Sequence, residues 1–178
     1  MVLDINGVLA DVRRREAPPV SRRKPDVVLP NRQKAYMHPC CAIFLQWLCD
    51  SRVPVVLFTS RTSRNAAPLE SAMARLCPAF KPVYTMHGED CEGSCCPEES
   101  WRPMKSADMV VRALRWPSET TKHLLFVDDH PDRIKLGDAR VVGVSSYNAA
   151  TQSDQQAEQS MKDTMWDIRD TITSLPEK

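Results

Sequence analysis

Five residues far apart in the chain combine side chains that suit phosphoryl chemistry. Asp4 follows a short apolar run, Thr59 lies near the end of the run PVVLFTS, and Asp128 and Asp129 end the run HLLFVDD. Lys105 follows a stretch rich in Pro, Gly and Cys. Carboxylate oxygens are the ligands that Mg²⁺ prefers, a Lys ammonium neutralises negative charge, and a Thr hydroxyl can donate to a phosphate oxygen. Together these residues would form a site for a phosphoryl group and a hard cation.

The elements that must bring these residues together are buried strands that alternate with helices. Unbroken apolar runs indicate strands that are covered on both faces, and apolar residues at helical spacing indicate helices. The predicted strands cover residues 2–5, 54–60, 123–129 and 141–147, and the predicted helices cover 39–51, 64–77 and 105–115. This alternation is typical of an α/β fold with a parallel sheet, whose functional residues lie at the carboxyl ends of the strands. We therefore expect one common site at that edge of the sheet.

The last part of the chain predicts one long amphipathic helix. Ser153 and Gln156 have the spacing of a capping box, which marks the start of a helix. The apolar stripe that follows consists of Ala157, Met161, Met165, Ile168, Ile172 and Leu175. We therefore expect a domain over residues 1–150 with a small irregular insertion at 78–103, and a helix within 151–178 that packs on it.

The composition is that of a globular chain. Hydrophobic residues make up 42% and charged residues 26% of the 178 positions, and the net charge is +1. This balance predicts no direct binding of nucleic acid. No run is apolar and long enough for a membrane helix, and the acidic residue at position 4 argues against a signal or transit peptide. We expect a soluble protein with no membrane partner.

The glycines and cysteines bear on nucleotide binding and on the cellular compartment. The five glycines are too far apart for a P-loop or a dinucleotide fingerprint, which excludes those modes of nucleotide binding. Seven cysteines without a secretion signal favour a reduced, intracellular compartment. A nuclear or cytoplasmic location is therefore expected rather than an organellar one.

Four motifs in order resemble those of the haloacid dehalogenase superfamily of phosphatases. DINGVL, which begins at Asp4, is similar to motif I, LFTSR with Thr59 to motif II, Lys105 to the lysine of motif III, and LLFVDDHP to motif IV. The segment from KAYMHPCC to SRNAAPL is similar to the C-terminal-domain phosphatases, a branch that includes small phosphatases of the RNA polymerase II tail and the Dullard type. The resemblance spans residues 2 to about 148. It implies a three-layer α/β sandwich with a central parallel sheet and no large cap domain.

The resemblance also implies a role for each matching residue. Asp4 would be the nucleophile that forms an aspartyl-phosphate, with Thr59 and Lys105 holding the transferring group. The residues implied for substrate binding are Thr59, Ser60, Arg61 and Lys105, and those implied for Mg²⁺ are Asp4, Asn6 through its backbone carbonyl, Asp128 and Asp129. Substrates of the family are mostly phosphoserine or phosphothreonine in proteins. The partner would therefore be a phosphorylated protein or peptide, or a protein assembly.

Asn6 departs from the family pattern, which has an Asp as general acid and base at this position. An amide cannot exchange a proton near neutral pH, and loss of a general acid-base costs about 10²- to 10⁴-fold in rate. One reading is a slow phosphatase in which His38, His130 or a metal-bound water moves the proton. The other is a catalytically impaired pseudo-phosphatase that binds phosphopeptides or serves as a structural subunit. Deamidation of the Asn6-Gly7 pair to an aspartate is a third hypothesis.

Other features carry weaker predictions. His87, Cys91, Cys95 and Cys96 could bind zinc, with reduced loop thiols as the alternative. The basic triplets at 13–15 and 22–24 could steer acidic phosphopeptides, form a nuclear localisation signal, or be a solvated loop in an extended or loosely paired segment. Cys40, Cys41 and Cys49 are predicted to pack in the core, and Trp101 and Trp166 are candidate anchors for a partner.

Overall fold

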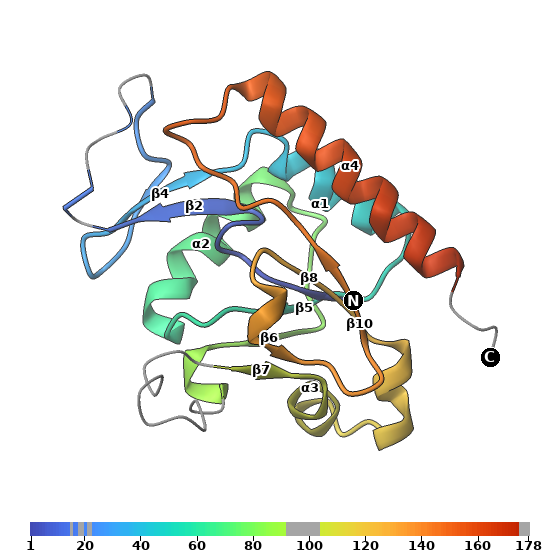
Figure 1. Cartoon of the computed structure of the whole chain (residues 1–178). Helices are drawn as coiled ribbons and strands as arrows, with labels where there is room; N and C mark the ends of the chain where they lie inside the picture. Colours follow the sequence, from blue (N-terminus) through green and yellow to red (C-terminus); the bar gives the residue numbers. More distant parts are fainter. Residues whose placement is uncertain (15, 18–19, 21–22, 92–103, 175–178) are drawn as a thin grey trace.

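The computed structural model describes residues 1–14, 16–17, 20, 23–91 and 104–174. Its centre is a five-stranded sheet with the order β10-β8-β1-β5-β6 (Figure 1), and its four strand pairings are parallel. The strands are β1 Val2–Leu3, β5 Val56–Phe58, β6 Tyr84–Met86, β8 Leu125–Asp128 and β10 Arg140–Gly143. The predicted α/β fold with a central parallel sheet is confirmed.

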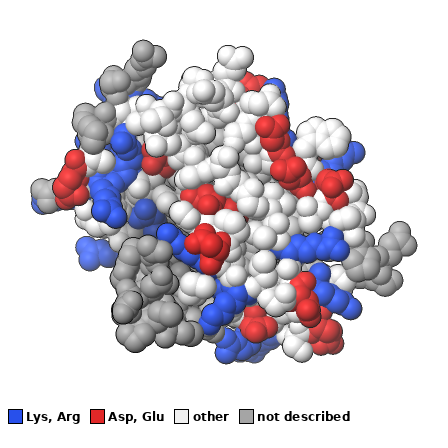
Figure 2. All heavy atoms as spheres, in the orientation of Figure 1, with Lys and Arg blue, Asp and Glu red and all other residues white. Residues whose placement is uncertain are grey.

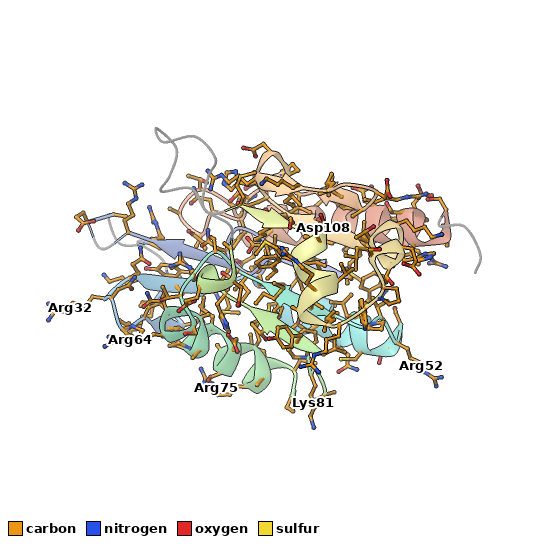
Figure 3. All side chains as sticks on the ribbon, turned by 90° about the horizontal axis from the view of Figure 1, so that it is seen from below. Arg32, Arg52, Arg64, Arg75, Lys81 and Asp108 are labelled. Atoms are coloured by element: carbon orange, nitrogen blue, oxygen red, sulfur yellow. The ribbon has the colours of Figure 1, made fainter. Side chains whose placement is uncertain are left out.

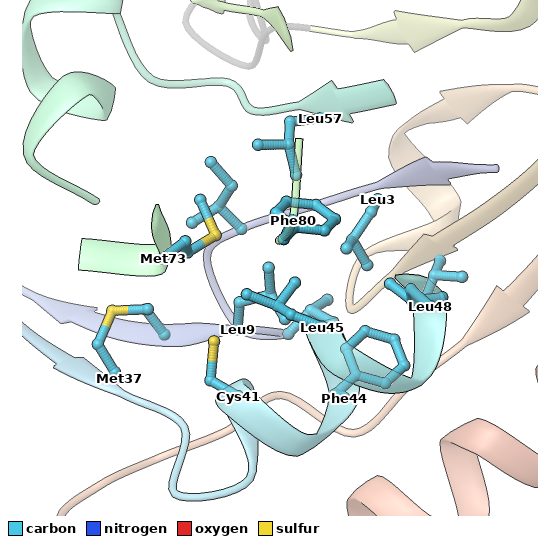
Figure 4. Packing of buried hydrophobic residues seen from close by; sticks show 14 of the residues in the cluster. Leu3, Leu9, Met37, Cys41, Phe44, Leu45, Leu48, Leu57, Met73 and Phe80 are labelled. Atoms are coloured by element: carbon cyan, nitrogen blue, oxygen red, sulfur yellow. The ribbon is translucent and has the colours of Figure 1, made fainter. Parts of the chain in front are cut away.

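The three middle strands are apolar on both faces because both faces are covered. Val2 is in register with Val56 and Phe126, and these side chains belong to one buried cluster. The residues that follow them, Leu3, Leu57 and Val127, point to the opposite face and belong to the other cluster. Figure 4 shows Leu57 and Leu3 beside Phe80, with Leu45 and Leu48 of the helix beneath. An unbroken apolar run therefore indicates a doubly covered strand here.

Helices on both faces of the sheet produce three layers. The helices are α1 Cys41–Asp50, α2 Ser63–Leu76, α3 Ala107–Ala113 and α4 Asp154–Thr173, with short 3₁₀ helices η1 Gly88–Asp90, η3 Ser118–His123 and η4 Pro131–Arg133. Buried residues of α1, α2 and α4 lie in the cluster on one face, and those of α3 lie in the cluster on the other. None of the helices in the described ranges has both the length and the apolar character needed to cross a bilayer.

The structure corrects three of the predicted elements. The helix predicted over 105–115 begins at Ala107, because Lys105–Ser106 form the short strand β7, which pairs with β9 Ile134–Lys135. The predicted insertion at 78–103 supplies β6, the edge strand of the sheet, and its residues 92–103 lie outside the described part of the chain. Strand β6 is too short and too exposed at Tyr84 to give a periodic signal.

The third correction concerns residues 10–37, which we name the flap. Its described residues form an antiparallel sheet with the order β2-β4-β3, where the sequence predicted an extended loop or a loose hairpin over residues 11–33. Its strands are β2 Ala10–Arg13, β3 Val27–Val28 and β4 Lys34–Met37. Lys and Arg side chains gather over this region at the left of Figure 2. On the face seen in Figure 3, Arg32 of the flap and Arg64 and Arg75 of α2 point away from the protein.

Helix α4 begins where the capping box predicts. Ser153 Oγ accepts a hydrogen bond from Gln156 N at 3.2 Å, and Gln156 Oε1 accepts one from Ser153 N at 2.8 Å. Ala157, Met161 and Ile168 of the predicted stripe are buried, whereas Leu175 lies outside the described residues. The helix packs beside β10. The division of the chain at residue 150 stays a prediction.

Candidate active site

The predicted site residues follow neighbouring strands at the switch point of the sheet. From β1 the chain passes to β5 and β6 on one side, and it later returns to β8 and β10 on the other side of β1. Ligands of open α/β sheets bind at such a point, outside the carboxyl ends of the strands. Asp4 follows β1, Thr59 follows β5, and Asp128 ends β8. All three therefore lie at this end of the sheet.

Lys105 contacts two of the carboxylates directly. Its Nζ lies 2.7 Å from Oδ1 of Asp4 and 2.6 Å from Oδ2 of Asp128. The exposed fractions of Lys105, Asp4 and Asp128 are 6%, 7% and 4%. Buried charges of this kind are screened little by salt. The pairing of β7 with β9 positions Lys105, so segments that are remote in sequence meet here.

Asp129 completes an acidic cluster. One carboxylate oxygen from each of Asp4, Asp128 and Asp129 lies within 4.8 Å of the others. Three carboxylates and the Lys105 ammonium carry two negative charges in excess, which a divalent cation would neutralise. Hard oxygen ligands of this kind suit Mg²⁺. The cluster therefore has the ligand set that the predicted cofactor, Mg²⁺, requires.

Burial and neighbouring opposite charges shift the pKa values of Asp4 and Lys105 in opposite directions. Burial is the largest influence on Asp4 and raises its pKa to about 6, while Lys105 acts to lower the pKa and the Asp128 and Asp129 carboxylates raise it. Burial alone would lower the pKa of Lys105, but Asp4 and Asp128 outweigh burial and raise it above its usual value. Lys105 therefore stays charged, and a cation added to the cluster would favour ionised Asp4.

Gly7 allows Asp129 to approach the turn after β1. A Cβ added to Gly7 would overlap the Asp129 carboxylate, and the φ angle of Gly7 is +85°. Glycine meets both conditions at no steric cost. The turn is fixed by Gly7 N, which donates to Ala10 O at 2.7 Å, and by Tyr147 N, which donates to Gly7 O at 2.7 Å. The sequence carried no signal for the contact between this turn and Asp129.

The loop after β5 carries the other predicted substrate-binding residues. Thr59 is fully buried, and its Oγ1 accepts a hydrogen bond from Arg61 N at 3.3 Å. Ser60 is exposed and Arg61 is half-buried. Burial lowers the pKa of Arg61, and the Asp4 carboxylate acts against this.

Arg61 also connects this loop to the flap. Its Nη1 donates to Oε1 of Gln33 at 2.7 Å, and its Nη2 donates to Oδ1 of Asn6 at 3.5 Å. The Nε of Arg61 is buried without a hydrogen-bond partner. A guanidinium N–H of this kind can donate to a phosphate oxygen. Gln33 was not predicted, because a single polar residue in a loop carries no sequence signal.

The Asn6 side chain is held on the flap side of the turn. Its Oδ1 accepts a hydrogen bond from Val12 N at 3.1 Å in addition to the one from Arg61. The amide therefore connects β2 to Arg61. Since an amide does not titrate near neutral pH, this contact orients groups and transfers no proton.

The two histidines considered as proton carriers differ in their surroundings. The His38 ring is buried, its Nδ1 accepts a hydrogen bond from Cys40 N at 3.1 Å, and burial followed by the Arg23 charge lowers its pKa to about 4. His130 is 48% exposed, and its Nε2 lies 3.7 Å from Oδ2 of Asp129. His130 is therefore the histidine beside the carboxylate cluster.

The zinc hypothesis stays a prediction. His87 Nε2 lies 3.0 Å from Oε1 of Glu70, and Cys91 Sγ donates to the His87 carbonyl at 3.7 Å, while Cys95 and Cys96 lie outside the described residues. Within the described residues, the group with metal-ligand geometry is that of Asp4, Asp128 and Asp129.

The remaining sequence features divide between core and surface. Cys40 and Cys41 are buried and Cys49 is half-buried, so their predicted packing role is confirmed. In the basic triplets, Arg14 and Lys24 are exposed and Arg23 pairs with Asp26 at 2.9 Å, whereas residues 15 and 22 lie outside the described part. Trp166 is 69% exposed, and Trp101 lies outside the described part.

Comparison with known proteins gives similarity of fold at a low level. No family model matches the chain, and no curated protein matches its sequence. Among solved structures, it is similar to the 3-deoxy-D-manno-octulosonate 8-phosphate phosphatase of Moraxella catarrhalis, solved with magnesium, phosphate and KDO. The identity is 12%, the TM-score is 0.42, and the match covers 98% of this chain and 91% of the other.

A second similar structure is a "probable YrbI family phosphatase" of Pseudomonas syringae pv. phaseolica. Its identity is 14%, its TM-score is 0.42, and the match covers 99% of this chain and 92% of the other. At identities of 12% and 14%, these two structures do not indicate a function for this chain.

Proposed function

We propose that the protein is a Mg²⁺-dependent phosphatase of the haloacid dehalogenase type that acts slowly on phosphoserine or phosphothreonine in proteins. The observation that carries this proposal is the Lys105 ammonium, which contacts both Asp4 and Asp128 beside Asp129. An apolar core does not need three carboxylates and a lysine at one point, because buried charges are costly unless they are paired. Their position at the switch point of the sheet supports a ligand-binding role.

In the proposed reaction Asp4 is the nucleophile. Lys105 holds Oδ1 of Asp4, so Oδ2 is the oxygen that attacks phosphorus. The new bond joins Asp4 Oδ2 to phosphorus as the bond between phosphorus and the ester oxygen breaks, and this oxygen takes up a proton from water or from His130. Water then attacks the aspartyl-phosphate, releases inorganic phosphate and restores the Asp4 carboxylate. Mg²⁺, when bound, would neutralise charge on the phosphoryl oxygens.

Two side chains around Asp4 would bind the phosphoryl oxygens. The Thr59 hydroxyl and the Arg61 guanidinium lie on the loop that follows the neighbouring strand, and the buried Arg61 Nε has no protein partner. Donors fixed in advance at a buried site stabilise charge that develops in the transition state. Asp128 is fixed as well, since its Oδ1 accepts a hydrogen bond from His130 N at 2.8 Å.

Slow turnover follows from Asn6. The Asn6 amide is engaged by Val12 N and Arg61 and cannot protonate a leaving serine oxygen. His130, exposed beside Asp129, is the side chain that we propose as a proton carrier in its place. The presence of Asn6 also favours the second candidate, a pseudo-phosphatase that binds phosphopeptides or is a subunit of an assembly. In that case the charged site is complete but the general acid is missing.

A protein substrate is supported by the basic residues of the flap, which is connected to the site. Lys and Arg gather over the flap, which Gln33 and Arg61 connect to the active-site loop (Figure 2). Positive charge of this kind attracts acidic phosphopeptides. A phosphorylated protein or peptide, or a protein assembly, is accordingly the partner that we propose.

The test compares two substrates that differ in their need for an acid. Nitrophenolate leaves from para-nitrophenyl phosphate without a proton, whereas the oxygen of phosphoserine needs one. With Mg²⁺, wild-type protein should hydrolyse the first substrate better than a phosphoserine peptide, and Asn6→Asp should raise turnover of the peptide by about 10²- to 10⁴-fold. Asp4→Asn should abolish both activities.

The possible outcomes separate the readings. Wild-type activity that Asp4→Asn removes supports the enzyme, and activity that is gained only in Asn6→Asp supports the binding module. Absence of activity in all variants contradicts the phosphatase assignment.

Two further experiments address the remaining hypotheses. Intact mass and peptide mapping of fresh protein test deamidation of Asn6. Beryllium fluoride binding tests whether the phosphoryl pocket is intact without turnover.

A further inference from the structure

The outer face of α4 carries an exposed tryptophan that the proposed active site does not use. Trp166 is 69% exposed, the highest fraction among the large apolar side chains of the described residues. It lines a groove of about 260 Å³ with Trp47 of α1 and with Met165, Lys162 and Arg169 of α4. One turn before Trp47 on α1, Ile43 is 65% exposed. Contiguous exposed apolar surface of this kind marks an interaction site.

Charges of both signs surround Trp166 in a regular order. On a helix, residues three, four and seven positions apart share a face. Lys162 and Asp163 precede Trp166 on this face by four and three positions, and Arg169 and Asp170 follow it by three and four. All four are exposed. Figure 2 shows basic and acidic atoms side by side over the upper right of the molecule, where α4 lies.

This order is complementary to itself. If two copies of α4 lie antiparallel and cross at Trp166, Lys162 of one copy meets Asp170 of the second copy, and Asp163 meets Arg169. A two-fold interface requires this property, because each surface must match itself after rotation. Reversing the charges of Lys162 and Asp163 alone would remove this self-complementarity.

We infer that this face is the interface of a homodimer in which two α4 helices pack antiparallel about Trp166. The indole of each copy enters the groove beside Trp47 of the other or stacks against its counterpart, and both arrangements bury the exposed apolar surface. The Lys162–Asp170 and Asp163–Arg169 pairs set the register. Lys162 also contacts Glu158 of its own helix at 2.7 Å, so the pairs across the interface add to an existing one.

The carboxylate cluster follows strands of the central sheet, whereas this face is the side of α4 opposite its buried stripe. The inference is therefore independent of the proposed phosphatase function. A helix-to-helix contact is smaller than the standard interface of about 1,600 Å², so we expect a reversible dimer.

Analytical ultracentrifugation of the full chain over a wide concentration range tests the inference. Wild-type protein should sediment as a mixture of monomer and dimer whose dimer fraction rises with concentration. Trp166→Ser should weaken dimerisation by about tenfold or more, as truncation of an anchor does. Trp116→Ser is the matched control, because Trp116 is an exposed tryptophan outside α4. It should leave the dimer unchanged.

Charge exchange gives the sharper test. Lys162→Glu with Arg169→Glu makes the face acidic, and Asp163→Lys with Asp170→Lys makes it basic. Each double variant alone should be monomeric, and an equimolar mixture should form heterodimers at least as stable as the wild-type dimer. Unchanged circular dichroism verifies folding. Wild-type protein that stays monomeric at every concentration, or a mixture that fails to associate, would overturn the inference and leave the face to a different protein partner.

Discussion

At the scale of single residues, the site depends on backbone freedom as much as on charge. Asp129 reaches the cluster because Gly7 has no side chain and adopts a positive φ angle. Such a requirement is invisible to a search for chemical groups, since glycine contributes none. The carboxylates and the lysine could be proposed from the sequence, whereas the residue that makes room for them could not.

Comparing Gly7→Ala with Gly137→Ala should separate the cost of a positive φ angle from the effect of a clash with Asp129. Gly137 also has a positive φ angle of +56°, but a Cβ there meets nothing within 4 Å. We expect Gly137→Ala to cost about 1–2 kcal/mol of stability from the left-handed conformation alone. Gly7→Ala should cost more, and it should weaken Mg²⁺ binding by about tenfold or more because it displaces Asp129. Calorimetric titration with Mg²⁺ and denaturant unfolding measure both effects.

Equal Mg²⁺ affinity in the two glycine variants would contradict the proposed role of Gly7. The comparison is informative because the variants share the substitution and the sign of φ. They differ in whether the added methyl group meets a carboxylate.

At the scale of elements, long periodic segments were predictable and short ones were not. The middle strands and α4 carry unbroken apolar runs or a capped stripe, so their place in the chain follows from periodicity. Strand β7 consists of Lys105 and Ser106 and has no periodicity, and it exists because β9 pairs with it. The flap strands and β6 are likewise formed by tertiary pairing that local sequence does not encode.

The junction between β4 and α1 should make stability depend on pH. Burial and the Arg23 charge lower the pKa of His38 from its ordinary 6.5 to about 4, and Nδ1 must be unprotonated to accept the hydrogen bond from Cys40 N. Between these values the unfolded chain binds a proton that the folded chain excludes. The stabilisation is therefore complete above pH 6.5 and is lost as the pH falls toward 4.

His38→Asn is the variant that tests this dependence. Its amide oxygen can accept the same hydrogen bond without titrating. We expect wild-type protein to lose about 1.4 kcal/mol of unfolding free energy per pH unit below pH 6.5 through this residue, and the variant to lack that loss. Denaturant unfolding at a series of pH values measures it. Parallel curves for the two proteins would show that His38 is not the group responsible.

At the scale of the whole molecule, the cation site links function to stability. Its carboxylates lie at the ends of β1 and β8, and Lys105 comes from β7, so the site exists only when these segments are assembled. A ligand that binds only the folded state stabilises it by about 2.7 kcal/mol at a hundredfold excess over its dissociation constant. We therefore expect added Mg²⁺ to raise the melting temperature and a chelator to reverse the rise.

Asp128→Asn and Asp138→Asn form a matched pair for this measurement. Asp128 belongs to the carboxylate cluster, whereas Asp138 is an exposed residue of the loop before β10. Only the first substitution should remove the stabilisation by Mg²⁺. An equal rise in melting temperature for both variants would place the cation elsewhere.

The position of β1 has a consequence for synthesis of the protein on the ribosome. β1 precedes both of its neighbours in sequence and is the middle strand of the sheet, because Val2 pairs with both Val56 and Phe126. It gains its second neighbour only after the segment that forms β8, about 120 residues later, has been translated. Until then an apolar strand edge is available to other nascent chains, so we expect efficient folding in cells to require a chaperone that shields it.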